Sequence, residues 1–96
     1  MTVLELVCEK REEILRIAAK HGVRRMRLFG SVARGEAGPE SDVDFLVEAC
    51  AHTSPWFPAG LILDLEDLLG RPIHVVTEAA LNPELRQRVV EEAVPV

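Results

Sequence analysis

The sequence lacks the features that would place the protein in a membrane or outside the cell. It has no apolar run of the length that a bilayer requires. Its N-terminal segment carries Glu5 and Glu9 where a signal peptide would have its apolar core. Its two cysteines, Cys8 and Cys50, are isolated and form no Cys-x-x-Cys motif, which is typical of a protein with reduced thiols. We therefore expect a soluble, cytoplasmic protein with no membrane contact.

The chain also lacks an excess of basic residues. Its 11 Lys and Arg residues against 16 Asp and Glu residues give a formal net charge of −5. This balance argues against general binding to nucleic acid, which depends on neutralising phosphates. Arg24, Arg25 and Arg27 nevertheless form a local basic cluster. That cluster could meet an acidic partner or substrate phosphates, lie at a solvated strand edge, or form ion pairs with the acidic first helix.

Size and composition indicate a single globular domain over residues 1–96. With 48% hydrophobic and 28% charged residues, the chain has the composition of a globular protein rather than a disordered one. A domain of 96 residues buries only a modest fraction of its surface. A homo- or hetero-oligomeric contact is therefore a reasonable expectation.

The spacing of apolar residues predicts alternating helices and strands, with one helix running from the capping box at Thr2–Glu5 to Gly22. Asn82 and Pro83 have the pattern of a helix start. The fold class we expect is α/β (α+β), a small mixed sheet of three or more strands with helices on one face and the site on the other. The remaining predicted elements are strands at 23–29, 43–48 and 73–76, a short helical turn at 31–34, and helices at 61–69 and 83–94.

A short motif carries the chemistry. Gly30-Ser31 is followed, after ten residues, by Asp42-Val43-Asp44. Alternate residues of a strand share a face, so the two carboxylates project side by side and repel each other unless a cation lies between them. Mg²⁺ takes such oxygen ligands together with substrate phosphates, and backbone N–H groups at a tight turn bind phosphate oxygens. The alternatives are two exposed carboxylates and an ordinary strand-to-helix turn.

Arg34 follows the Gly-Ser turn and has two possible roles. Its planar guanidinium suits phosphate oxygens. Equally, it could form an ion pair with Glu36 or Glu40.

Residues 28–37 (LFGSVARGEA) and 41–47 (SDVDFLV) closely resemble the minimal nucleotidyltransferase family, small relatives of the polymerase-β-like nucleotidyltransferases. The resemblance extends to the order of the elements, the Leu-Gly-Arg-Pro step at 69–72 and the Val-Thr ending at 76–77. It implies the nucleotidyltransferase fold and a Mg²⁺-dependent transfer of a nucleoside monophosphate, most simply AMP from ATP, to a hydroxyl. The residues that it implies are Asp42, Asp44 and Ser31 in catalysis, Gly30, Ser31 and Arg34 in nucleotide binding, and Asp42 and Asp44 as metal ligands.

The same resemblance implies a biological setting, a two-gene toxin–antitoxin pair. In this setting the minimal nucleotidyltransferase is the antitoxin and modifies a tyrosine of an all-helical HEPN ribonuclease toxin. The chain itself contains no tyrosine, so self-modification on tyrosine is excluded.

His74 is where the sequence departs from the family. Active members carry a third carboxylate on the last strand, two residues before the Val-Thr ending, and here that position is His74. Strand parity places His74 on the same face as Val76. The resemblance implies that this face belongs to the site, so His74 should lie near Asp42 and Asp44. Imidazole is a poor Mg²⁺ ligand, but it could act as a general base or replace a metal charge. It could also be a bystander. The alternative function is therefore a catalytically impaired module that binds nucleotide or partner and neutralises the partner by contact.

Overall fold

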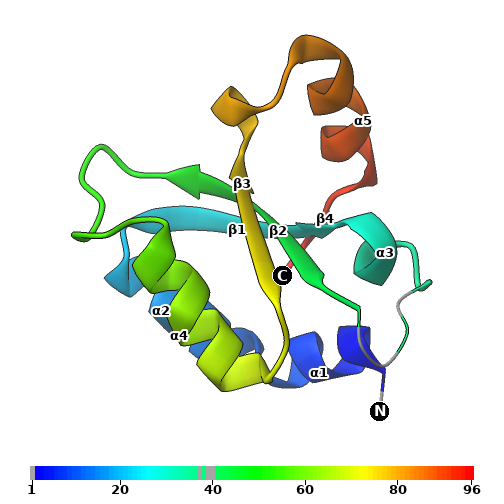
Figure 1. The fold of residues 1–96 in the computed structure, drawn as a ribbon, viewed down its shortest axis with the longest axis horizontal. Coiled ribbons are helices and arrows are strands. Elements are labelled where there is room, and N and C mark those ends of the chain that lie inside the picture. Colours follow the sequence, from blue (N-terminus) through cyan, green and yellow to red (C-terminus); the bar gives the residue numbers. More distant parts are fainter. Residues whose placement is uncertain (1, 37, 39–40) are drawn as a thin grey trace.

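A four-stranded mixed sheet organises the chain (Figure 1). The structure is a computed structural model that describes residues 2–36, 38 and 41–96. The strands lie in the order β3-β2-β1-β4, with β1 antiparallel to β2 and β4 and with β2 parallel to β3. The predicted α+β class with a mixed sheet is confirmed. In chain order the elements are α1 (Val3–Glu9), α2 (Arg11–Lys20), β1 (Val23–Phe29), α3 (Gly30–Ala33), β2 (Val43–Ala49), α4 (Ala59–Leu69), β3 (Ile73–Thr77), the 3-10 helix η1 (Glu78–Ala80), α5 (Pro83–Glu92) and β4 (Val94–Pro95).

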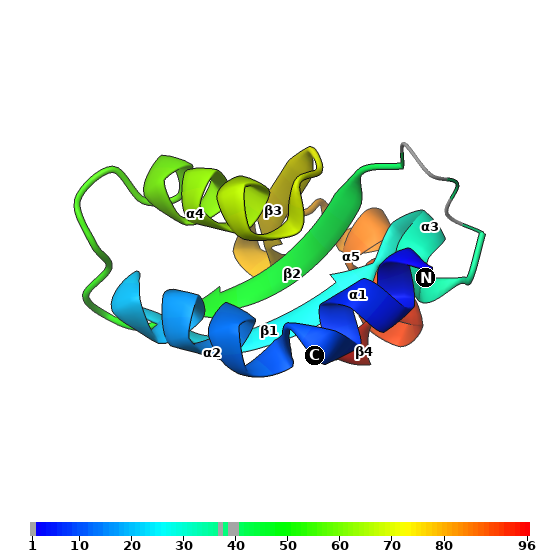
Figure 2. The same cartoon turned by 90° about the horizontal axis from the view of Figure 1, so that it is seen from below.

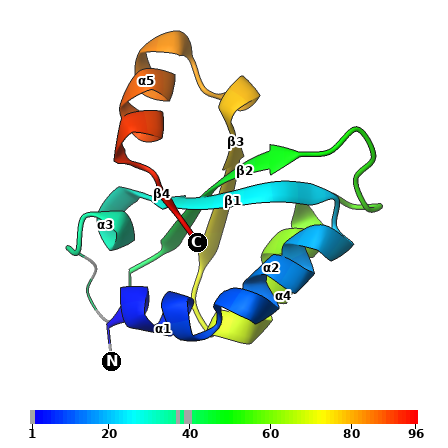
Figure 3. The same ribbon diagram turned by 180° about the vertical axis from the view of Figure 1, so that it is seen from behind.

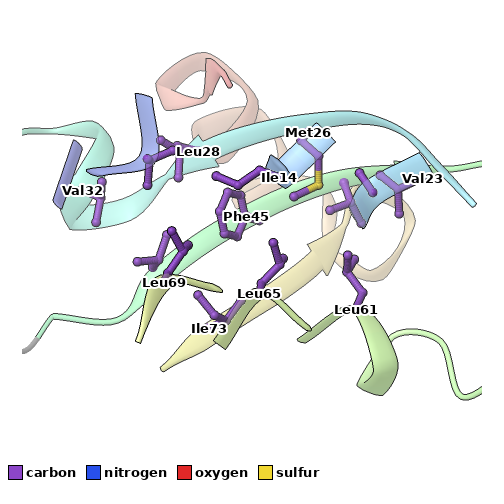
Figure 4. Close-up of a cluster of buried hydrophobic side chains, with 14 of the residues drawn as sticks. Ile14, Val23, Met26, Leu28, Val32, Phe45, Leu61, Leu65, Leu69 and Ile73 are labelled. Carbon is purple, nitrogen blue, oxygen red and sulfur yellow. The ribbon is translucent and has the colours of Figure 1, made fainter. Parts of the chain in front are cut away.

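Helices α1, α2 and α4 cover one face of the sheet and enclose the core (Figures 1 and 2). Because successive strand residues point to opposite faces, Met26, Leu28 and Phe45 all face these helices. There they pack with Ile14 and Leu65, which are fully buried (Figure 4). Each such side chain contributes about 1.5–3 kcal/mol by its burial. The core therefore fixes the orientation of β1 and β2, which carry the motif residues at their ends.

The predicted first helix is wrong in one respect, because the chain forms two helices there. Thr2 caps α1 as expected, its Oγ1 accepting a hydrogen bond from the Glu5 backbone N–H at 3.1 Å. The helix then breaks at Lys10, which has φ −93° and ψ 11°, and α2 begins at the next residue. The bend brings α1 against α3, where Val3 and Val32 line the same small cavity and are both buried in the core. Tertiary packing thus overrides a continuous helical pattern.

Helix α5 lies on the side of the sheet opposite α1, α2 and α4 (Figure 2). Asn82 caps it as predicted, its Oδ1 accepting a hydrogen bond from the Leu85 backbone N–H at 2.9 Å. The helix nevertheless has no fully buried residue, so it does not join the layer of helices that the sequence predicts on one face. The chain after α5 runs alongside β1 as β4, where Val94 pairs with Leu28 (Figure 3). Polar contacts and this short pairing, rather than the core, therefore hold α5.

Candidate active site

The turn at Gly30 lies directly against the Asp44 carboxylate. Phe29, the last residue of β1, pairs with Asp44 of β2, and the chain then turns into α3 at Gly30 with φ +76°. A Cβ atom at residue 30 would lie 2.3 Å from Asp44 Oδ2, which is closer than real atoms approach. Glycine is therefore required both by the left-handed backbone and by the carboxylate. This arrangement brings together the two halves of the motif.

Asp42, Asp44 and His74 form one group at the start of β2 and β3. Asp44 and His74 are register partners in the parallel pair of strands, so their side chains lie on the same face of the sheet. His74 Nε2 lies 2.9 Å from Asp42 Oδ2, within hydrogen-bond distance. The side chains of His74 and Asp42 are 57% and 48% exposed, so a second molecule can reach both groups.

Asp44 is the most buried of the three residues, and this burial shifts the pKa of its carboxyl. Burial raises the pKa of the Asp44 carboxyl above its ordinary value, because removal from water disfavours the charged form. The nearby charge of His74 opposes this rise, and the negative charge of Asp42 adds to it. A divalent cation between the two carboxylates would favour the ionised form of both.

The donor set can hold Mg²⁺ together with a phosphate-bearing ligand. In the part of the chain that the structure describes, no group of three or more His, Cys, Asp or Glu side chains is placed to hold a metal alone. Asp42 and Asp44 supply two carboxylates, which is the share that Mg²⁺ usually takes from a protein when phosphates and water complete its octahedron. The arrangement therefore suits a metal that arrives with a nucleotide.

Arg34, just beyond α3, forms two ion pairs. Its Nε lies 2.8 Å from Glu36 Oε2, and a terminal nitrogen bonds Glu92 at the end of α5. Pairing with Glu36 is one of the alternatives that the sequence leaves open, whereas Glu40 lies outside the described residues. Ser31 is the second residue of α3 and is partly buried. Sequence reasoning missed Glu92, since no local spacing connects two residues 58 positions apart.

Comparison with known proteins agrees with this geometry. The family described as "Nucleotidyltransferase domain" matches residues 7–96. The chain belongs to this nucleotidyltransferase family.

The nucleotidyltransferase is also similar to named relatives and to solved structures. It is 40% identical over 88 residues to "Putative protein adenylyltransferase MJ0435" of Methanocaldococcus jannaschii, covering 92% of this chain and 95% of that protein. It is 35% identical over 94 residues to "Protein adenylyltransferase MntA" of Thermococcus cleftensis, covering 93% and 95%. A solved structure described as "putative minimal nucleotidyltransferase" shares 45% identity with a TM-score of 0.86, covering 97% of this chain and 95% of that one. A toxin–antitoxin crystal structure with AMP-PNP has a TM-score of 0.71 at 24% identity, covering 91% and 69%, and shows a common fold.

Two arginines of the basic cluster of the nucleotidyltransferase, Arg24 and Arg27, pair with carboxylates other than Asp42 and Asp44. Arg24 pairs with Glu48 of β2, and Arg27 pairs with Glu78 of η1. Of the alternatives that the sequence leaves open for the cluster, pairing with the first helix is therefore not the one found for these two arginines. The Arg27 side chain is 8% exposed, and its Nε has no hydrogen-bond partner among the described residues. The buried Arg27 side chain thus links β1 to η1 through an ion pair.

No helix that the structure describes has both the length and the apolar character needed to span a bilayer.

Proposed function

We propose that this nucleotidyltransferase transfers AMP from ATP to a hydroxyl of a partner protein in a Mg²⁺-dependent reaction. The observation that carries the proposal is the contact between the Gly30 turn and the Asp44 carboxylate, with Asp42 and His74 beside them. Relatives at 40% and 35% identity are named as protein adenylyltransferases, which supports the same chemistry.

Each residue of the group has a role in this transfer. The acceptor oxygen bonds to the α-phosphorus, the bond from that phosphorus to the bridging oxygen breaks, and pyrophosphate leaves. Asp42 and Asp44 would hold the metal, and Gly30 and Ser31 would contact phosphate oxygens through N–H and hydroxyl groups. When bound there, Mg²⁺ would neutralise phosphate charge and orient the reacting groups. His74 would accept the proton of the acceptor hydroxyl.

The proposed acceptor is a tyrosine of a HEPN-type helical toxin, and the chain would act as its antitoxin. Asp42 and His74 are about half exposed, so the site has room for a residue from a second protein. The chain has no tyrosine that could serve as its own acceptor. The toxin–antitoxin setting follows from the family resemblance, and one relative is named MntA.

The decisive experiment measures the intact mass of the proposed partner, a HEPN-type helical protein. After incubation with ATP, Mg²⁺ and wild-type protein, we expect a mass gain of one or more AMP units. Asp42→Asn and Asp44→Asn should abolish the gain, and Asp67→Asn, which removes a charge from the exposed face of α4, should retain it. Equal gains in all four proteins would remove the proposed mechanism.

A second function, neutralisation by contact alone, is favoured by one observation. His74 Nε2 lies 2.9 Å from Asp42 Oδ2, and the sequence resemblance would put the family's third carboxylate at this position. If this function is correct, the double variant of Asp42→Asn and Asp44→Asn still binds and inhibits the helical partner. A large rise in transfer by His74→Asp would further identify the native chain as an impaired enzyme.

A further inference from the structure

We propose that the surface cavity between α3 and α5 receives the terminal phosphates of the bound triphosphate, and that Glu92 is the anion which these phosphates displace. The cavity has a volume of about 420 Å³ and is lined by Arg34, Arg88, Glu91 and Glu92. The inference rests on the proposed function and adds to it a subsite, a second arginine and an internal competitor.

Glu92 is one of the two carboxylates that pair with the Arg34 guanidinium. Glu36 accepts from the Arg34 Nε at 2.8 Å, and Glu92 accepts from a terminal nitrogen of the same guanidinium. The Glu92 side chain is 26% exposed, less than the 64% of Glu36, so Glu92 is the inner of the two carboxylates. A guanidinium binds carboxylate and phosphate oxygens with the same planar geometry. A phosphate group can therefore replace Glu92 at Arg34.

Arg88 supplies a second cation to the same cavity. It lies one turn before Glu92 on α5, at a spacing where an Arg and a Glu ordinarily pair along a helix. Glu92 bonds Arg34 instead, and Arg88 forms no ion pair with any residue that the structure describes. Once Glu92 turns to solvent, the cavity presents the guanidinium groups of Arg34 and Arg88 to one anion.

The position of the cavity relative to Asp44 suits the remaining phosphates of a triphosphate. Arg34 and Gly30 are separated by the single turn of α3, and the Arg34 backbone N–H donates to the Gly30 carbonyl at 3.1 Å. Helix α3 contacts both β2, the strand that carries Asp44, and α5, the helix that carries Glu92. An α-phosphate at Asp44 therefore has its β- and γ-phosphates beside α3, on the side of α5.

Because α5 has no fully buried side chain, Glu92 can leave Arg34 without disrupting the core. The helix is held by its Asn82 cap, by Arg86, which donates to the Glu78 carbonyl at 3.1 Å, and by the Arg34–Glu92 pair. Loss of the last contact opens no part of the core, because none of the α5 side chains is fully buried. Nucleotide binding would then free the Glu92 side chain while the Asn82 cap, Arg86 and the pairing of β4 with β1 still hold α5.

The test compares binding of inorganic tripolyphosphate, Mg-ATP and AMP by isothermal titration. Glu92→Gln removes the competing anion, so we expect tripolyphosphate and Mg-ATP to bind about two- to fivefold more tightly, the size of an exposed ion pair. Arg88→Gln should weaken both by a similar factor. AMP lacks the terminal phosphates, so its affinity should change little in either variant.

Two controls carry the same charge changes elsewhere. Glu84 lies at the other end of α5, and Arg16 lies on α2, across the sheet. The Glu84→Gln and Arg16→Gln variants should both bind tripolyphosphate with the affinity of the wild type. Arg88 has no ion pair to lose among the described residues, so Arg88→Gln tests the subsite without disturbing α5.

The outcomes separate this inference from the proposed function. Wild-type affinities for tripolyphosphate and Mg-ATP in both Glu92→Gln and Arg88→Gln, with transfer to the partner intact, overturn the subsite alone. Weaker anion binding in Glu92→Gln also overturns it, because a competitor cannot strengthen binding of its rival. A wild-type protein that binds no Mg-ATP removes the proposed function and the subsite together.

Discussion

Gly30 and Asp44 meet so closely that residue 30 has no space for a side chain: a Cβ there would lie 2.3 Å from Asp44 Oδ2. The contact joins the backbone turn that would bind phosphate to the carboxylate that would bind metal. Neither group can move far without the other, because β1 and β2 are paired up to Phe29 and Asp44. Placement of groups before substrate arrives is the main means by which phosphoryl-transfer sites act.

Gly30→Ala should therefore lose both stability and nucleotide binding. The left-handed backbone alone costs an alanine about 1–3 kcal/mol, and the clash with Asp44 displaces the carboxylate. Gly70→Ala is the matched control, since Gly70 has φ +65° and no atom within 4 Å of a built Cβ. Chemical denaturation and titration with Mg-ATP should show a stability loss in both variants and a binding loss in Gly30→Ala only. Normal Mg-ATP affinity in Gly30→Ala would contradict the role of this contact.

Asp44→Asn should raise stability at neutral pH while it abolishes transfer. The folded-state pKa of Asp44 is raised, so folding favours the protonated form. The stability linked to this group is complete below the pKa of the unfolded chain and is lost as pH rises through the folded-state pKa. Asparagine mimics the neutral carboxyl group. The melting temperature of the Asp44→Asn variant should therefore exceed that of the wild type at pH 7 and approach it in acid.

Thermal melts of wild type and Asp44→Asn from pH 3 to pH 8, with and without Mg²⁺, measure this effect. Mg²⁺ should raise the melting temperature of the wild type and leave that of the variant nearly unchanged. A variant that melts below the wild type throughout the range would show that the carboxylate has a structural role instead.

His74→Ala should reduce the transfer rate by about 10²–10⁴, the usual contribution of a positioned general base. His74→Gln separates a base from a positioning residue, because its amide can still donate to Asp42 but cannot accept the proton. We expect both variants to be slow at saturating ATP in a partner-modification assay. Full activity of His74→Gln would assign His74 to the positioning of Asp42.

Asp64→Asn should lower stability at neutral pH through a cluster remote from the site. The buried His21 bonds Asp64 Oδ2 through Nε2 at 2.6 Å and Ser54 Oγ through Nδ1 at 2.5 Å. The hydrogen bond from His21, and then that from Lys20, lower the pKa of the Asp64 carboxyl. Its stabilisation is therefore present above the pKa of the unfolded chain and is lost as pH falls through the lower, folded-state value.

Melting temperatures measured between pH 2 and pH 8 test this linkage. The difference between wild type and Asp64→Asn should be largest near neutrality and shrink toward pH 2. Asp67→Asn, an exposed change on the same helix, should show no such pH-dependent difference. A constant difference at every pH would mean that the loss comes from packing rather than from the ionised carboxylate.

The sequence alone determined the features that depend on neighbours along the chain. Thr2 and Asn82 cap their helices because a capping side chain bonds a backbone N–H three residues away. Asp42 and Asp44 project to the same side because strand parity is a local rule. The place of His74 beside them comes from the pairing of β2 with β3, which the sequence indicated only through its resemblance to the nucleotidyltransferase family. Fold class and the motif itself were predictable because they depend on short-range patterns.

Only the tertiary structure decided the partners of the charged side chains and the course of the terminal elements. Arg27 bonds Glu78 and Arg34 bonds Glu92, across 51 and 58 positions of sequence, so no spacing could indicate either pair. The break at Lys10 likewise follows from packing of α1 on α3, which a continuous helical pattern does not reveal. Backbone periodicity acts over a few residues. A charged side chain instead pairs with whichever opposite charge lies near it in space, and the distance between the two is set only once the sheet has formed.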